Sequence, residues 1–227
     1  MLVAQTHPAS IEAEAYRTVR ANLELMSANG SARHIVVTSA TGGDGKSTTA
    51  ANLAIVVAQG GRRVCLVDAD FRRPTLHDMF GLPNVDGLAA ALEYAKPLPS
   101  VARSADIENL SVVVAGRGSS ETFHDILTPQ RLSRILEDSE ADFDVVIFDC
   151  PPVISSDALS VAAVCGGVLL VVRAGRISFG TLRRAIGQIT QVKAKVLGVL
   201  LNQFDPRAAD AGAHHYYHAY HTPRSKG

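Results

Sequence analysis

The amino-acid sequence predicts an α/β fold built on a doubly wound, mostly parallel sheet. Six short apolar runs rich in β-branched residues recur along the chain, at residues 34–39, 64–68, 110–115, 145–149, 167–173 and 196–202. Longer segments with helical spacing, at 47–59, 129–140 and 178–191, separate most of them. Strands that alternate with helices need crossover connections, which place the strands parallel in one sheet. The run 168–172 is apolar at every position, as expected for a strand that is covered on both faces.

Length and composition favour one large domain that needs neither a disulfide bond nor a structural metal ion to be stable. The chain has 227 residues, enough to bury a core of its own, and 22 acidic residues balance 22 basic ones. A chain without net charge is not expected to recruit nucleic acid. Cys65, Cys150 and Cys165 lie in or beside apolar runs and form no CxxC pair, which indicates buried thiols in a reducing compartment.

The sequence contains no pattern typical of a membrane span or a leader peptide. Residues 1–10 lack a basic stretch followed by an apolar core. The longest uncharged apolar stretch, 158–172, has only fifteen residues and contains two adjacent glycines. The sequence therefore predicts a cytoplasmic protein.

The rest of the chain divides into an irregular middle segment and a polar tail. Four prolines between residues 74 and 99 interrupt the middle segment, 75–109, which predicts short helical turns and loops. Residues 206–227 lack apolar periodicity and are predicted to be flexible. The predicted organisation is one domain at 1–205, with an N-terminal helix at about 10–27, followed by the tail.

A phosphate-binding loop follows the first predicted strand. The segment A-T-G-G-D-G-K-S at residues 40–47 leads directly into a predicted helix, an order that a chance glycine-rich turn would not produce. Its glycines let backbone N–H groups point at a phosphate, and the start of the helix adds the positive end of its dipole. Lys46 is expected to reach the terminal phosphates, and Ser47 to bind Mg²⁺. The predicted nucleotide-binding residues of this loop are Thr41, Gly42, Gly43, Asp44, Gly45, Lys46, Ser47 and Thr48.

Two other predicted strands end in acidic residues. Asp68 and Asp70 lie in the segment V-C-L-V-D-A-D-F-R, and Asp149 ends the strand V-V-I-F-D. A carboxylate at the tip of an apolar strand costs stability unless a cation pairs with it, and Mg²⁺ beside a triphosphate is a natural partner. The alternative interpretation is that these carboxylates cap the turns that follow. The predicted metal ligands are Ser47, Asp68 and Asp149.

Several segments together resemble the bacterial tyrosine kinases of capsule and exopolysaccharide synthesis, whose cytoplasmic kinase domain has a deviant P-loop fold similar to that of the partition ATPases. Besides the P-loop, these are D-A-D-F-R at 68–72, F-D-C-P-P at 148–152, E-A-Y-R-T-V-R at 14–20 and H-H-Y-Y-H-A-Y at 214–220. The third fits the family's E-x-x-R-x-x-R helix, and the last looks like its C-terminal tyrosine cluster. The resemblance covers residues 12–205 and the tail.

The resemblance implies an autokinase that uses ATP and Mg²⁺. Its catalytic residues would be Lys46, Asp68, Asp70 and Asp149. Either Asp68 or Asp70 would accept the proton of the incoming tyrosine hydroxyl. Arg72 would either bind phosphate or pair with an acid, and Asn202, at the end of the last predicted strand, would lie near the adenine. The implied phosphate acceptors are Tyr216, Tyr217 and Tyr220.

The resemblance also implies partners. The N-terminal helix would place Glu14, Arg17 and Arg20 at a subunit interface, so that a ring-like homo-oligomer presents each tail to the next active site. The alternative for these residues is a solvated helix face with internal ion pairs. Further implied partners are the cytoplasmic segment of a membrane chain-length determinant or activator protein, which would recruit the kinase to the inner face of the plasma membrane, and a tyrosine phosphatase.

Two rival functions remain open from the residues. A partition or septum-placing ATPase acts as a nucleotide-switched dimer and shares the acidic strand ends. Such proteins carry an additional lysine early in the P-loop, where this chain has Thr41, and a tyrosine-rich tail has no place in their scheme. The other rival is a kinase-like ATPase that has lost phosphotransfer and gates polysaccharide export.

Overall fold

The computed structural model describes residues 1–27, 33–117, 123 and 125–204. Its centre is a seven-stranded sheet of order β3-β4-β2-β5-β1-β6-β7. The strands are β1 His34–Ser39, β2 Val64–Asp68, β3 Arg103–Ser104, β4 Leu110–Val113, β5 Val145–Asp149, β6 Gly167–Arg173 and β7 Lys195–Asn202. All neighbours pair in parallel except β3, which is antiparallel to β4 at the edge. The predicted doubly wound, mostly parallel sheet is confirmed.

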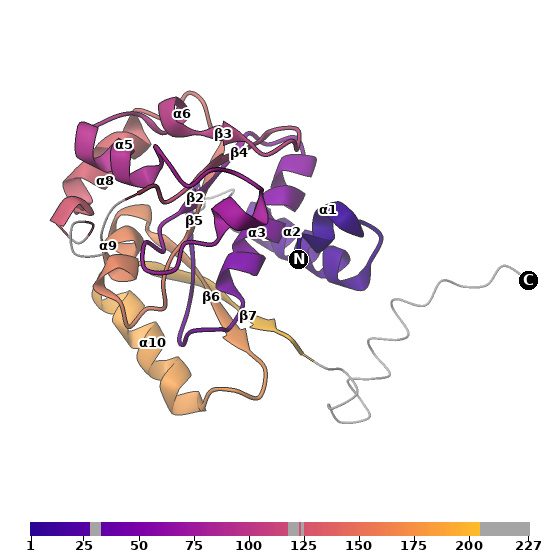
Figure 1. Ribbon diagram of the computed structural model, residues 1–227. Helices are drawn as coiled ribbons and strands as arrows, with labels where there is room; N and C mark the ends of the chain where they lie inside the picture. Colours follow the sequence, from indigo (N-terminus) through magenta and orange to yellow (C-terminus); the bar gives the residue numbers. More distant parts are fainter. Residues whose placement is uncertain (28–32, 118–122, 124, 205–227) are drawn as a thin grey trace, which may run out of the picture.

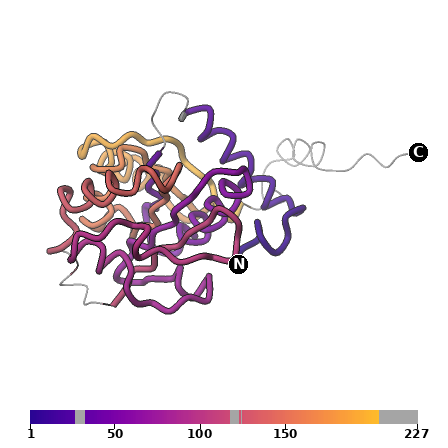
Figure 2. The backbone as a smooth tube through the Cα atoms, turned by 90° about the horizontal axis from the view of Figure 1, so that it is seen from above, coloured from indigo at the N-terminus to yellow at the C-terminus, as the bar shows by residue number. Residues whose placement is uncertain are grey.

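Helices cover both faces of the sheet (Figure 1). One face carries α1 Val3–Thr6, α2 Ile11–Ser27 and α3 Lys46–Gln59. The other carries α5 Leu88–Tyr94, α8 Pro129–Glu137, α9 Ser156–Cys165 and α10 Phe179–Gln191, and two short helices, α4 Leu76–Met79 and α6 Leu98–Val101, lie in the connections. Seen from above, the N-terminal helices and α10 again lie on opposite sides of the molecule (Figure 2).

Both faces of the central strand β1 are buried, which explains its continuously apolar sequence. Ile35 and Val37 pack on the side of α3, whereas Val36 between them packs on the side of α9 and α10. Successive side chains of a strand point to opposite faces, so a strand between two helical layers needs apolar residues at both sets of positions. Its carboxyl end is thereby held at the edge of the sheet where the P-loop begins.

Helix α3 is enclosed by the sheet on one side and by α1 and α2 on the other. Ten consecutive residues, 49–58, are buried. Asn52 ties the layers together, because its Oδ1 accepts a hydrogen bond from Ala4 N (2.9 Å) and its Nδ2 donates to Thr48 O (2.8 Å). The enclosure fixes the helix that begins at the P-loop lysine.

The strand predicted at 167–173 is confirmed as β6, but helix α9 before it was not predicted, and one predicted strand ends early. The apolar stretch 158–172 holds most of α9 and all but one residue of β6, and Gly166, with a φ of +74°, ends the helix between them. The strand predicted at 110–115 ends at Val113, because the carbonyls of Val114 and Ala115 accept hydrogen bonds from the first residues of α5 (2.8 and 3.0 Å). The predicted turns at 75–109 contain α4, α5 and α6, together with β3, which the sequence did not predict.

Within the described residues, no helix is long and apolar enough to cross a bilayer. Cys65 and Cys150 are fully buried, as predicted, whereas Cys165 is half-buried. The predicted tail at 206–227, with Tyr216, Tyr217 and Tyr220, lies outside the described residues.

Candidate nucleotide and phosphotransfer site

The P-loop connects β1 to α3 and is held in shape by its own side chains. The buried carboxylate of Asp44 accepts hydrogen bonds from the backbone N–H of Thr41 (3.1 Å) and from its hydroxyl (2.9 Å). Gly43 and Gly45 have φ values of +82° and +90°, in the left-handed region that favours glycine. Thr41 and Asp44, both predicted to bind nucleotide, therefore also shape the loop.

Asn202, at the end of β7, supports the same loop from outside. Its Nδ2 donates a hydrogen bond to Asp44 O (2.8 Å), and a methyl group built on Gly45 would overlap this amide nitrogen. Asn202 therefore contacts the backbone of the P-loop, and its position near adenine stays a prediction. Gly45 is required for two reasons, its positive φ and the close approach of Asn202.

Substituting Gly45 by alanine is therefore expected to destabilise the fold and to weaken ADP binding by about tenfold or more, because the loop must move away from Asn202. Gly61→Ala is the matched control, since Gly61 has a φ of +84° but open space where a methyl group would lie. We expect Gly61→Ala to lose about 1 kcal/mol of stability from backbone strain alone and to bind ADP normally. Urea unfolding and calorimetric titration measure both effects, and equal behaviour of the two variants would contradict the role of Asn202.

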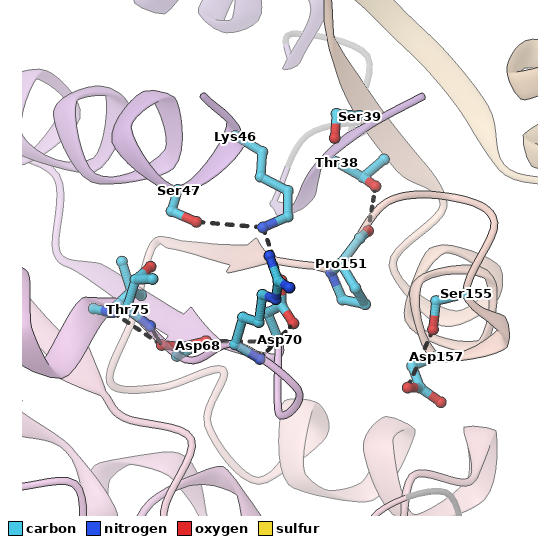
Figure 3. Close-up of polar contacts among 12 residues, drawn as sticks. Thr38, Ser39, Lys46, Ser47, Asp68, Asp70, Thr75, Pro151, Ser155 and Asp157 are labelled. Atoms are coloured by element: carbon cyan, nitrogen blue, oxygen red, sulfur yellow. Dashed lines mark hydrogen bonds and ion pairs between the residues drawn. The ribbon is translucent and has the colours of Figure 1, made fainter. Parts of the chain in front are cut away.

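Lys46 lies at the start of α3 and is buried against acidic groups. Its Nζ is 2.8 Å from Asp70 Oδ2, and the two side chains are 13% and 5% exposed. Figure 3 shows them pointing toward each other, with Ser47 beside Lys46. Burial lowers the pKa of Lys46, but Asp149, Asp70 and Asp68 together outweigh that effect, so its pKa is raised overall. The amine is therefore charged at neutral pH.

Asp68 and Asp70 follow β2 and differ in their surroundings. Asp68 accepts three backbone hydrogen bonds, from the N–H groups of Thr75 (2.9 Å), Leu76 (3.0 Å) and Asp70 (3.2 Å). Asp70 accepts one, from Arg73 N (3.1 Å), besides its ion pair with Lys46. Burial raises the pKa of Asp68 to about 6, partly offset by the three hydrogen bonds. Asp68 thus has the geometry of a turn cap, the alternative that the sequence left open.

Asp149 ends β5 and lies directly between the other functional strands. The sheet register places it opposite Asp68 on β2 and opposite Val37 on β1. It is fully buried, and neither carboxylate oxygen forms a hydrogen bond of normal length and angle with any described residue. Burial raises its pKa to about 7, while the Lys46 charge and the Ser47 hydroxyl act in the opposite direction.

Asp149 is suited to bind Mg²⁺ together with Ser47. Its carboxylate is buried and its oxygens form no normal hydrogen bond with the described residues. The described residues contain no cluster of three or more His, Cys, Asp or Glu side chains that could enclose a metal. Mg²⁺ at nucleotide sites is held by one or two protein oxygens, phosphate oxygens and water, so Ser47 and Asp149 are sufficient ligands. Asp68 is less suited, because its oxygens already accept three hydrogen bonds.

A cavity of about 620 Å³ opens beside these groups. Its walls come from the P-loop, from the segment after β2 and from residues 151–156. Thr38 fixes the last of these segments by donating a hydrogen bond to Pro151 O (2.6 Å), as Figure 3 shows. Arg72 lies in the wall, 66% exposed, with its Nε 4.0 Å from Asp157 Oδ2, so it forms a loose ion pair and remains available to a phosphate.

The arginines of the N-terminal helix have partners within their own chain. Arg17 pairs with Glu14 (2.7 Å) and donates to Pro8 O (2.9 Å). Arg20 donates to Val56 O near the end of α3 (2.9 Å), so it fixes α2 against the P-loop helix. The Arg17–Glu14 pair agrees with the alternative of an internal ion pair, the Arg20 contact instead joins two helices, and the predicted subunit interface stays a prediction.

Two cationic residues near the site were not predicted from the sequence. Arg73 lines the cavity next to Arg72. Arg176, in the turn after β6, lies against the P-loop, because a methyl group built on Gly43 would be 3.4 Å from its Nη1. Both follow the carboxyl end of a parallel strand, which is the signal that could have identified them.

The comparisons with known proteins agree with this geometry. The chain matches the ParA family, described as "NUBPL iron-transfer P-loop NTPase", over residues 31–221. It is 35% identical to the tyrosine-protein kinase YwqD of Bacillus subtilis over 202 residues, which are 88% of this chain and 85% of that protein. The chain belongs to the bacterial tyrosine-kinase family. It also resembles the kinase domain of the Escherichia coli tyrosine kinase ETK, with a TM-score of 0.85 and 29% identity over 93% of this chain and 83% of that one.

Other relatives of this chain are longer or more distant. The chain covers 27% of the putative tyrosine-protein kinase EpsB of Ralstonia solanacearum, at 34% identity over 90% of this chain. The cobyrinic acid a,c-diamide synthase of Mycobacterium smegmatis, solved with bound ADP and magnesium, has a TM-score of 0.65 and 26% identity over 78% of this chain and 77% of that one. The P-loop fold is therefore shared with a protein whose structure holds ADP and magnesium.

Proposed function

We propose that this chain is an ATP- and Mg²⁺-dependent protein-tyrosine autokinase that phosphorylates Tyr216, Tyr217 and Tyr220 in trans within a ring-like homo-oligomer. The observation that carries the proposal is Asp149, a fully buried carboxylate without a normal hydrogen bond to any described residue, next to the Lys46–Asp70 pair. Such an arrangement is costly in the empty protein, and a nucleotide–metal complex would relieve the cost. The similarity to YwqD and ETK, both named tyrosine kinases, supports the reaction class.

The reaction transfers the γ-phosphoryl group of ATP to a tyrosine hydroxyl. The tyrosine oxygen forms the new bond to phosphorus, the bond between the γ-phosphorus and the bridging oxygen breaks, and ADP leaves. Lys46 would turn from Asp70 to the phosphates and neutralise their charge. Mg²⁺, held by Ser47 and Asp149, would supply further neutralisation.

Asp70 is the better candidate for the base that accepts the tyrosine proton. Asp68 is occupied by three backbone N–H groups, whereas Asp70 loses its ion pair with Lys46 once Lys46 moves to the nucleotide. Asp70 also lines the cavity, where an incoming tyrosine ring fits between the P-loop and residues 151–156. In this assignment Asp68 positions the segment that carries Asp70.

We also propose the biological setting that the resemblance implies. Residues 1–205 would form the kinase domain, and the tail at 206–227 would be its substrate. Glu14, Arg17 and Arg20 would contribute to the ring interface. The chain would work in the cytoplasm, at the inner face of the membrane, with the cytoplasmic segment of a chain-length determinant or activator protein and with an opposing tyrosine phosphatase. Its phosphorylation state would regulate the polymerisation and export of a capsular polysaccharide or exopolysaccharide.

A switch ATPase is the second candidate, and the P-loop disfavours it. Thr41 stands where those proteins carry the lysine that reaches a partner's nucleotide, and here its hydroxyl and N–H both bind Asp44. The loop is therefore built without that cation.

A mixing experiment tests the proposal. The acceptor is Lys46→Ala with its tail intact, and the donor carries Tyr216→Phe, Tyr217→Phe and Tyr220→Phe with its active site intact. With ATP and Mg²⁺, we expect phosphate on the acceptor's tail only in the mixture, mapped by mass spectrometry. If the donor hydrolyses ATP while the acceptor's tail stays unmodified, the switch ATPase replaces the kinase.

A further inference from the structure

The turn between β6 and α10 brings a guanidinium group to the P-loop. Strands β1 and β6 are parallel neighbours, with Ser39 opposite Val171, so their carboxyl ends meet at one edge of the sheet. After β6, Gly175 takes a φ of +70° and Arg176 N donates to Arg173 O (3.3 Å), which closes a tight turn. This turn directs the Arg176 side chain to Gly43, where a methyl group would lie 3.4 Å from Nη1.

The position of the turn is fixed by hydrogen bonds that continue into the P-loop. Ala174 N donates to Asn202 O (2.9 Å), and the Asn202 side chain donates to Asp44 O (2.8 Å). On the other side of the turn, the Ser178 hydroxyl accepts a hydrogen bond from Thr181 N (3.1 Å) and caps α10. The backbone that carries Arg176 is therefore tied to the loop it approaches.

The guanidinium of Arg176 has no partner of its own among the residues the structure describes. No hydrogen bond or ion pair to its side chain is formed there, whereas Arg33 and Arg63 pair with Glu140 and Asp144 and Arg72 approaches Asp157. A guanidinium presents five N–H donors and is suited to phosphate oxygens. An arginine with free donors, held beside a phosphate-binding loop, points to an anionic ligand.

The direction from which the Arg176 guanidinium approaches the P-loop indicates which part of a bound nucleotide it contacts. The cavity with Lys46 and Asp70 has walls from the segments after β2 and β5 and reaches the P-loop at Gly43, whereas Arg176 approaches Gly43 from β6, on the other side of β1. The proposed function places the γ-phosphate and the acceptor tyrosine in the cavity. The phosphates nearer the nucleoside then extend along the loop toward Arg176.

We propose that Arg176 is a nucleotide-binding residue that contacts the α- or β-phosphate, the part shared by ATP and ADP. This assignment rests on the proposed function only for the direction in which the nucleotide lies. It separates two arginine positions around one loop: Arg72, at the cavity, faces the transferred phosphoryl group, and Arg176 holds the phosphates that remain on ADP.

The test is calorimetric titration of the purified 227-residue chain with ATP·Mg²⁺ and with ADP·Mg²⁺. We expect Arg176→Ala to bind both about ten- to a hundredfold more weakly, the loss of one or two hydrogen bonds to a charged group. Arg176→Lys, which keeps the charge but not the fork of donors, should recover part of the affinity. In the phosphorylation assay KM for ATP should rise, while kcat at saturating ATP should stay within about twofold, because the contact is made equally before and during transfer.

Arg183→Ala is the matched control, because that guanidinium lies on α10, 5.6 Å from the Phe179 ring centroid and apart from the P-loop. It should bind both nucleotides like the unmodified chain, and thermal unfolding without nucleotide should be unchanged for both variants. Unchanged ADP affinity in Arg176→Ala would overturn the inference, as would a fall in kcat with unchanged ADP affinity, which would assign the guanidinium to the transferred group. Weaker ADP binding in a protein that never phosphorylates tyrosine would remove the kinase proposal and leave this inference standing.

Discussion

Asp149→Asn is expected to lower phosphotransfer from ATP by about a hundred- to a thousandfold while making the nucleotide-free protein more stable at pH 8. The amide keeps the shape of the side chain but loses the charge that would hold Mg²⁺ with Ser47, so the transition state loses much of its electrostatic stabilisation. The carboxylate that it replaces is fully buried and forms no normal hydrogen bond with the described residues. Removing that desolvated charge stabilises the empty protein.

The stability gain from Asp149→Asn should increase as pH rises. Asp149 has a pKa of about 7 in the folded protein against 3.8 in its reference state, mainly because of burial. Between these values the folded state binds more protons than the unfolded state, so stability contributed by this group falls as pH rises from about 4 to about 7. Urea unfolding in EDTA should therefore show a larger gain for Asp149→Asn at pH 8 than at pH 4. A variant that is less stable than the unmodified chain at pH 8, or that retains phosphotransfer, would contradict the assignment.

Lys46→Met should lower phosphotransfer by about a thousandfold and should also destabilise the empty protein, by about 3 kcal/mol. Methionine keeps the length of the side chain but leaves Asp70 without the cation 2.8 Å away, and it removes the charge that lowers the pKa of Asp149. The two substitutions thus have the same effect on activity and opposite effects on stability.

Lys96→Met is the matched control for the second prediction, because Lys96 is exposed, with its Nζ 5.5 Å from the Tyr94 ring centroid. It should change neither activity nor stability by a measurable amount. Chemical unfolding and a phosphotransfer assay on the three proteins provide the comparison. An Lys46→Met protein as stable as the unmodified chain would show that the buried pair with Asp70 is not maintained in solution.

The sequence predicted every strand except β3, and the P-loop, because their signals are local. An apolar run that ends in Asp149 can be recognised within five residues, and parallel strands bring such ends to one edge of the sheet. Helix α9, which shares the apolar stretch 158–172 with the correctly predicted strand β6, could not be predicted in the same way. A helix covered on several sides has no polar face, so its apolar pattern does not differ from that of a buried strand.

The pairings inside the site depend on distances that no local pattern contains. Asp68 and Asp70 are two residues apart, yet one caps a turn and the other pairs with Lys46. Arg20 belongs to a motif that the resemblance assigns to a subunit interface, but its guanidinium reaches Val56 O of its own chain. Asn202 meets Asp44 O across 158 positions of sequence because β7 and β1 end at the same edge. Tertiary packing alone decides these contacts.

The central claim is that phosphate passes from ATP to tyrosines of the same protein. The direct measurement incubates the purified chain with Mg²⁺ and ATP labelled with ¹⁸O on the γ-phosphate, and then maps the label on the C-terminal peptide by mass spectrometry, with Lys46→Ala in parallel. The account predicts labelled phosphate on Tyr216, Tyr217 or Tyr220 and none in the variant. Consumption of ATP with the label found only in inorganic phosphate would contradict it.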